Sequence, residues 1–116
     1  MITLKVLLCA QDVCRDADTN TVSVFNVLDG IAGDGFPLLV QNFAMLAILE
    51  REAGDETQPK ATMDLRIGDT VLLNAAPLPI DFKDKLRTRQ TVRIGGLVLP
   101  APGVLEATLK LGDNVL

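Results

Sequence analysis

The sequence predicts an all-β protein, an antiparallel β-sandwich of about eight strands with Greek-key or jelly-roll-like connections. Apolar and polar residues alternate with a period of two along most of the chain, as in strands that bury one face. Turn-forming residues interrupt this alternation at short, regular intervals, which is typical of sandwiches and barrels. The chain has 116 residues, 48% of them hydrophobic, and no segment resembles a linker. We therefore expect one domain over residues 1–116.

Three strands are predicted in the first half of the chain. The first covers residues 2–9. Its buried face is expected to consist of Ile2, Leu4, Val6 and Leu8. A polar loop over residues 11–20 follows, and residues 21–28, rich in β-branched side chains, form the second strand. The Asp-Gly turn pair at 29–30 ends that strand, and irregular backbone continues until a third strand at residues 41–52.

The centre of the third strand is apolar on both faces, because every residue from 43 to 49 is apolar. Both faces must then be covered. One interpretation is a central strand with the core on one side and a neighbouring loop or helix on the other. The alternative is a subunit interface. In that case the contact residues would be Phe43, Met45, Leu46 and Ile48. Because alanine, methionine and leucine are good helix formers, a short helix is a third alternative.

Further strands follow in the second half. Residues 60–67 alternate cleanly and lead through a tight turn into a returning strand at residues 70–74. The side chains expected inward are Ala61, Met63, Leu65 and Ile67. Pro77 and Pro79 restrict the next strand to a sheet edge, because proline has no N–H for a ladder. From there onward, Leu78, Ile80 and Phe82 are expected to face the core.

The last predicted strands lie at residues 87–99 and 105–111. The first of these segments forms one or two strands, with a bulge or kink at the glycine pair 95–96. Hairpin-forming residues follow the second segment, yet only Val115 and Leu116 remain for a returning strand. The sequence leaves open whether the chain is truncated there or the strand is vestigial.

Four segments together resemble an uncharacterised family of small bacterial proteins. They are Leu-Cys-Ala-Gln-Asp at 8–12, the run at 21–31, Phe36-Pro37, and Leu-Pro-Ala-Pro-Gly at 99–103. The resemblance rests on their order and spacing and spans nearly the whole chain. It implies a β-sandwich of about eight strands, and it implies no activity. An immunoglobulin domain is a poorer match, because its Cys, Trp, Cys spacing is absent.

Composition argues against several classes of protein. The net charge of −4 disfavours non-specific nucleic-acid binding and attachment to an acidic membrane. No run of 18 apolar residues could cross a bilayer, and the first residues lack the features of a signal peptide. We therefore expect a cytoplasmic protein.

The chain contains no histidine, which excludes Ser-His and Cys-His nucleophile systems. Cys9 and Cys14 are the only cysteines, too few for a zinc site without histidine. They could close a small disulfide loop, but a reducing cytosol favours free thiols. We expect no catalytic residues and no cofactor.

Loop aspartates offer one alternative site. Asp12, Asp16, Asp29 and Asp34 could collect at one end of a sandwich and supply oxygen ligands for Ca²⁺. Their spacing lacks the glycine and the bidentate glutamate of an EF-hand, and aspartates in turns usually bond the local backbone. We expect no metal here, but a Ca²⁺-assisted or carboxylate-dependent hydrolase remains an alternative function.

The only basic concentration is formed by Arg87, Arg89 and Arg93, with Lys83 and Lys85 just before them. It could receive a phosphate or an acidic partner segment. The structural interpretation is a solvated strand face. Its arginines would then pair across the sheet with Asp64, Glu50 or Glu106.

Together these observations predict a non-enzymatic, cytoplasmic protein-interaction module. It would act through a sheet edge, its loops or the apolar strand at residues 43–49, and we expect it to form a homo-oligomer. We expect a protein partner of unknown identity, and neither nucleic acid nor membrane as a partner. A small-molecule-binding β-sandwich is a further alternative, which predicts a large closed apolar pocket.

Overall fold

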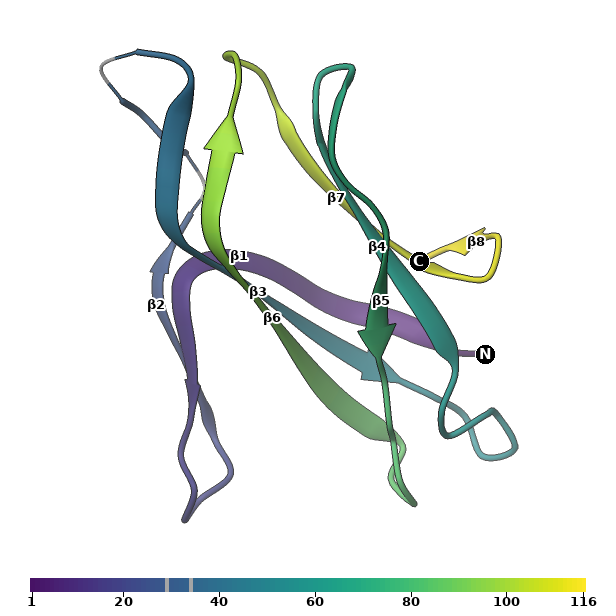
Figure 1. The fold of residues 1–116 in the computed structure, drawn as a ribbon. Helices are drawn as coiled ribbons and strands as arrows, with labels where there is room; N and C mark the ends of the chain where they lie inside the picture. The colour runs from purple at the N-terminus through teal and green to yellow at the C-terminus, as the bar shows by residue number, and fades with distance from the viewer. Residues whose placement is uncertain (29, 34) are drawn as a thin grey trace.

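The computed structural model describes residues 1–28, 30–33 and 35–116, which form two four-stranded antiparallel sheets (Figure 1). The first sheet has the strand order β2-β1-β3-β6. Its strands are β1 (Thr3–Arg15), β2 (Val22–Val27), β3 (Leu38–Glu50) and β6 (Arg87–Leu99). The second sheet has the order β5-β4-β7-β8. Its strands are β4 (Lys60–Ile67), β5 (Thr70–Pro79), β7 (Leu105–Leu111) and β8 (Asn114–Val115). The predicted all-β fold class is confirmed.

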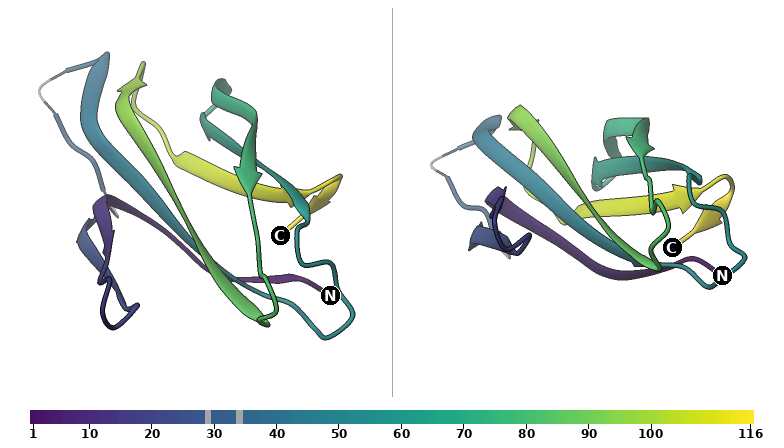
Figure 2. Two further views of the ribbon diagram at one scale, coloured as in Figure 1. Left: turned by 60° about the horizontal axis from the view of Figure 1, so that its bottom comes forward. Right: turned by 90° about the horizontal axis from the view of Figure 1, so that it is seen from below.

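The connections give the Greek-key arrangement. β3 pairs with β6 from Leu38↔Leu99 to Glu50↔Arg87, although β4 and β5 lie between them in the chain and belong to the other sheet. In the same way β7 returns beside β4. Each pairing places a strand next to one three positions earlier, as in a Greek key. Figure 2 shows the two resulting layers from two further directions.

The core lies between the two sheets and is aliphatic, with Phe43 and Phe82 as its fully buried rings. From β4 it contains the alternate residues Ala61, Met63, Leu65 and Ile67. Leu78, Ile80 and Phe82 join it from the end of β5 and the residues after it. These inward positions are those expected from alternation. The returning strand at 70–74 and the proline-containing strand after it, predicted as two, are one strand, β5, and it lies at the sheet edge as the prolines predicted.

The alternation expected for the first strand is wrong beyond Leu4. The pairing of β1 with β3 shifts register between Leu4 and Val6. Such a bulge adds one residue and reverses the facing of the side chains after it. The residues packed on the core are therefore Leu4, Leu7 and Cys9 of β1, together with Ile2 just before the strand. Val6 and Leu8, expected on that face, instead pair with Ile48 and Leu46 on the opposite face.

Strand lengths also differ from the prediction. The first half of the expected polar loop at 11–20 is strand, since β1 runs to Arg15, and the turn is confined to residues 16–20. β6 continues through the glycine pair at 95–96, where Gly96 takes a positive φ of 84°. β8 has only two residues and pairs with Lys110 and Leu111. In the described residues no helix occurs that could cross a bilayer.

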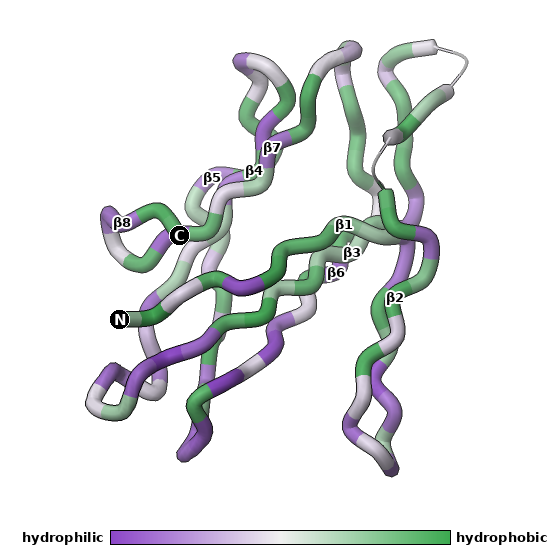
Figure 3. The backbone as a smooth tube through the Cα atoms, turned by 180° about the vertical axis from the view of Figure 1, so that it is seen from behind, coloured by the Kyte–Doolittle hydropathy of each residue, from purple (hydrophilic) through white to green (hydrophobic). Residues whose placement is uncertain are grey.

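The hairpin of β1 and β2 bends away from its own sheet. β1 pairs with β3 as far as Ala10↔Ala44 and then continues with β2 alone, from Asp12↔Phe25 to Arg15↔Val22. At the bend Asn26 has a left-handed backbone with φ of 54°, which asparagine tolerates better than most residues. We call residues 11–26 the arm. Figure 3 shows it projecting from the sheet beside the label β2.

Candidate binding groove

The arm covers the second apolar face of β3. Val13 from the arm and Ala44 and Leu46 from β3 form a separate buried cluster. Its surrounding residues are Val22, Val24 and Ile48. The strand is thus covered by the core on one face and by a neighbouring segment of the same chain on the other, as the structural interpretation predicted. The cover is a β-hairpin rather than a loop or helix.

This packing buries most of the residues that the sequence offered as contacts for a subunit interface. Phe43 and Met45 face the core and Leu46 faces the arm, and each is at most 2% exposed. They present no surface for another subunit in this structure. Ile48 is half-buried and lies at the edge of the arm cluster.

An open groove of about 730 Å³ lies between the arm and the first part of β6. We call it the basic groove. Six basic side chains line it: Arg15, Lys83, Lys85, Arg87, Arg89 and Arg93. They are six of the 11 lysines and arginines of the chain, whereas Asp81 is the one acidic residue in the lining. The structure therefore unites the basic residues singled out in the sequence and adds Arg15 from the arm.

The β6 arginines fasten the arm to the sheet. Arg89 donates from Nη2 to the backbone carbonyl of Asn20 at 2.7 Å and to its Oδ1 at 3.0 Å. Arg93 donates from Nη2 to the backbone carbonyl of Val13. Arg15 donates to Asn20 Oδ1 at 3.3 Å from within the arm. Because these acceptors are neutral, the contacts hold the guanidinium groups in place without cancelling their charge.

The ion pairs of the groove offset only part of its charge. Arg87 Nε lies 3.6 Å from Glu50, and Arg93 Nε lies 3.6 Å from Asp12. With Asp81, three carboxylates stand against six basic side chains, which leaves a net local charge of about +3. The whole chain carries −4. Within the described residues, no carboxylate comes within ion-pair distance of the remaining four basic residues, Arg15, Lys83, Lys85 and Arg89.

The expected cross-strand pairing is thus confirmed for one arginine. Arg87 pairs with Glu50, directly opposite it in the register of β3 and β6. The other two acids considered are taken by cations of the second sheet. Asp64 pairs with Lys110 at 3.0 Å and Glu106 pairs with Arg66 at 3.0 Å.

The turn that carries Lys83 and Lys85 is held by buried and backbone contacts. Phe82 is 1% exposed and donates its N–H to the carbonyl of Thr57 at 2.8 Å. Asp81 Oδ1 accepts from the N–H of Lys83 at 2.8 Å. Both lysine side chains remain exposed at the mouth of the groove.

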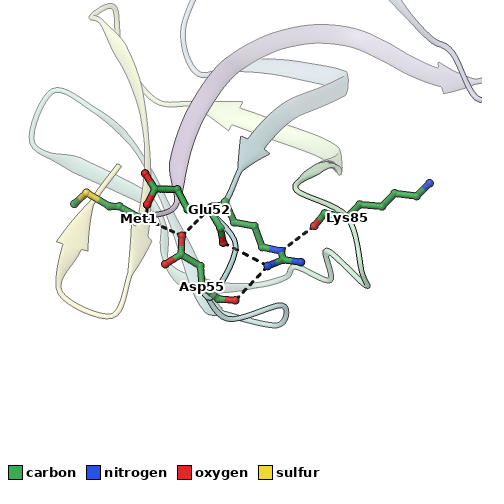
Figure 4. A network of polar contacts seen from close by, with 5 residues as sticks. Met1, Glu52, Asp55 and Lys85 are labelled. Carbon is green, nitrogen blue, oxygen red and sulfur yellow. Dashed lines mark hydrogen bonds and ion pairs between the residues drawn. The ribbon is translucent and has the colours of Figure 1, made fainter.

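Arg51 ties this turn to the segment after β3. Its Nε donates to the carbonyl of Lys85 at 2.8 Å, and its guanidinium lies 5.8 Å from the centre of the Phe82 ring. Its Nη1 lies 3.5 Å from the carbonyl of Glu52 and 3.4 Å from that of Asp55. Figure 4 shows Glu52, Asp55 and Lys85 in this network of polar contacts. The network anchors one wall of the groove to the end of β3.

The loop aspartates have local roles. Asp16 Oδ1 accepts from the N–H groups of Thr19 and Asp18 in the turn of the arm, and these bonds hold its pKa below the ordinary value. Asp12 faces Arg93. Asp29 and Asp34 lie outside the described residues. Among residues 1–28, 30–33 and 35–116, no three carboxylate or thiol side chains gather closely enough to hold a metal ion.

Both cysteines are free thiols, so the disulfide alternative is wrong. Cys9 is half-buried and packs on the core, and burial raises the pKa of its thiol. Cys14 is exposed on the arm, with its Sγ 3.7 Å from Asp12 Oδ2.

An apolar pocket of about 410 Å³ also opens between the sheets, lined in part by Leu28, Gly30, Ile31 and residues 101–105. Its lining includes Phe36 and Val104, which are 41% and 73% exposed. The pocket is therefore open to solvent, whereas a small-molecule-binding sandwich was expected to enclose a closed one.

Comparisons with protein-family models, with curated proteins and with solved structures find no match for this chain. The resemblance to a family of small bacterial proteins therefore stays a prediction. Functional inference rests on the geometry and charge of the basic groove.

Proposed function

We propose that this chain is a non-enzymatic protein-interaction module that binds an acidic segment of a partner protein in the basic groove. The observation that carries the proposal is the concentration of six of the 11 basic residues in one groove. A net local charge of about +3 on a chain of −4 leaves the rest of the surface acidic. An acidic segment would be attracted to the groove and repelled elsewhere, which gives both steering and register.

A protein segment fits this site better than a nucleic acid does. A nucleic acid longer than the groove would meet the acidic remainder of the surface and lose the phosphate contacts that provide its affinity. Single strands also gain affinity by stacking bases on exposed aromatic rings. The one aromatic residue lining the groove is Phe82, which is 1% exposed.

The chemistry of the lining also favours binding over catalysis. It presents guanidinium and ammonium donors with one carboxylate, Asp81, which bonds the backbone of its own turn. A general acid–base reaction needs a positioned group that exchanges protons near neutral pH. Cations fixed along a groove bind anions without needing such a group.

We also propose that the module acts in the cytoplasm. Its two thiols are free, one of them exposed, and a reducing compartment keeps such thiols from oxidising. Self-association into a homo-oligomer stays a prediction, which sedimentation velocity at micromolar concentrations tests directly.

Fluorescence anisotropy with a labelled glutamate-serine peptide tests the proposed function. The double variant Lys83→Gln/Lys85→Gln should weaken binding roughly three- to tenfold, because both lysines lie at the mouth of the groove without an ion-pair partner among the described residues. The matched control Lys60→Gln/Arg66→Gln removes the same charge from the second sheet and should leave the affinity unchanged.

Two results would overturn the proposal. The first is equal weakening by both double variants, which would mean that only the net charge matters. The second is tighter binding of a single-stranded oligonucleotide than of the peptide at the same salt concentration, which would identify nucleic acid as the ligand.

A further inference from the structure

We infer that the basic groove recognises an extended segment whose carboxylates occupy alternate positions, laid along β6. This inference rests on the proposed function and specifies the partner. The feature that carries it is the spacing of the β6 arginines, with Arg87 and Arg89 two residues apart and Arg93 four residues further.

The arginines form a row on one face because β6 is a continuous strand. Side chains two residues apart in a strand point to the same face and lie about 6.6–6.8 Å from each other. The register confirms this common face, since Arg87, Arg89 and Arg93 stand opposite Glu50, Ile48 and Ala44 of β3. Thr91, which also lines the groove, occupies the one position of the row without a charge.

An extended peptide repeats at the same distance as the strand beneath it. Carboxylates at its first, third and seventh positions would therefore match Arg87, Arg89 and Arg93, and the fifth position would face Thr91. A helix cannot make this match, because its side chains on one face recur every three or four residues. The row thus selects both the conformation of the segment and the pattern of its charges.

The arginines are also preorganised for such a ligand. Arg89 and Arg93 are already fixed by the carbonyls of Asn20 and Val13, and each guanidinium keeps further N–H groups for a carboxylate. A ligand that meets fixed side chains loses less entropy on binding than one that must order them. Val22 of the arm and Ile48 of β3, both only partly buried, offer apolar surface to the methylene groups of glutamate.

Two labelled peptides of the same composition test the inference. Glu-Ser-Glu-Ser-Ser-Ser-Glu has the proposed spacing, and Glu-Glu-Glu-Ser-Ser-Ser-Ser has the same charge in a cluster. We expect the first to bind about fivefold more tightly. The reversed sequence, Glu-Ser-Ser-Ser-Glu-Ser-Glu, then shows in which direction the segment runs along β6.

The outcomes separate this inference from the proposed function. Equal affinity of the spaced and clustered peptides, in either direction, overturns the spacing and leaves an acidic partner in place. Absence of binding by every acidic peptide overturns both. Binding that free inorganic phosphate displaces at low millimolar concentration would mean a single anion site, which also overturns an extended segment.

A gain-of-function variant gives an independent test. Thr91→Arg completes the row. In this variant the peptide Glu-Ser-Glu-Ser-Glu-Ser-Glu should bind about fivefold more tightly than Glu-Ser-Glu-Ser-Ser-Ser-Glu. Thr62→Arg adds the same charge on β4 of the second sheet and should change neither affinity. Equal gains from both variants would contradict the inference. Circular dichroism melting curves confirm that each variant is folded.

Discussion

The outer faces of the two sheets use charge in different ways. On the second sheet, Arg66 and Glu106 stand directly opposite each other in the β4–β7 register and form an ion pair, and Lys110 pairs with Asp64. On the first sheet, Arg87 and Arg93 of β6 also have carboxylates at 3.6 Å, but Arg89 is held only by the neutral acceptors of Asn20, and Arg93 also bonds the carbonyl of Val13. Charge is balanced locally on one face and left in excess on the other.

The difference teaches which charges are free to bind a partner. An exposed ion pair contributes about 0–1 kcal/mol to stability and presents little net field to a ligand. Cations fixed by neutral acceptors keep their field and their orientation, which are the properties of a binding site. The same residue types thus form ion pairs on β4 and β7, whereas on β6 they line the groove that we propose as a binding site.

The largest effect is expected from the apolar contact that holds the arm over β3. Leu46→Ala should lower the free energy of unfolding by about 2–4 kcal/mol, because Leu46 is 2% exposed within the arm cluster. Urea denaturation measures this change. Leu39→Ala, on the same strand but 55% exposed, should cost about 0.5 kcal/mol or less. Similar losses for both variants would show that the arm does not bury this face.

Removing one arginine from each face tests the comparison directly. Arg89→Gln should weaken binding of the spaced acidic peptide about tenfold and lower the unfolding free energy by about 1 kcal/mol, since its bonds to Asn20 are lost. Arg66→Gln should change stability by less than about 1 kcal/mol and leave binding unaltered. Isothermal titration and urea melts give the two readouts. Equal effects on binding would remove the distinction between the faces.

The fold was largely predictable because alternation survives on a strand that carries no extra residue itself. On β4 it survives because the pairing with β7 is regular and the extra residues in the pairing with β5 lie on β5. The prolines of β5 placed that strand at an edge. β1 was not predictable in the same way. The bulge beside Lys5 depends on how β1 pairs with β3, and nothing in the local pattern marks the residue at which facing reverses.

Only the β6 side of the groove was predictable from the sequence, and the arm side was not. The basic residues of β6 and the preceding turn are close in sequence, so their concentration was visible. Arg15 and Asn20 join them through the bend of the arm, and Asn20 contacts Arg89 across 69 residues of chain. The available signal was the alternation of Val22 and Val24 in the predicted second strand, which indicates a strand face to be covered. Val13 is the apolar residue within the predicted polar loop that packs on the same face.

A salt titration should sharpen the comparison with a moderate effect. Raising the salt concentration from about 50 mM to about 500 mM should weaken peptide binding several-fold, because screening reduces the field of the unbalanced charges. The unfolding free energy should change less, because the ion pairs of the second sheet contribute little to it. Anisotropy and urea melts at matched salt concentrations check both. Salt-independent binding would contradict an electrostatic groove.

The smallest expected effect concerns acid. The N–H of Ala75 and then the ammonium of Lys110 hold the pKa of Asp64 below its ordinary value of 3.8. A lowered pKa in the folded state contributes stability above the unfolded pKa and loses it as pH falls through the folded pKa. The stability difference between the wild type and Asp64→Asn should therefore shrink as the pH falls below 3.8. Urea midpoints measured on both sides of that pH test this, and a constant difference would contradict it.

Because Arg89 and Arg93 serve both purposes, attachment of the arm and binding of a ligand in the groove are thermodynamically coupled. Arg89 and Arg93 each fasten the arm and present charge to the groove. A ligand that binds their remaining N–H groups therefore also strengthens or weakens the attachment of the arm, which forms one wall of its binding site. Occupancy must then be felt at the backbone amides of the arm, well beyond the residues that touch the ligand. A substitution at either arginine likewise changes both the attachment of the arm and the affinity for the ligand, so neither property can change without the other.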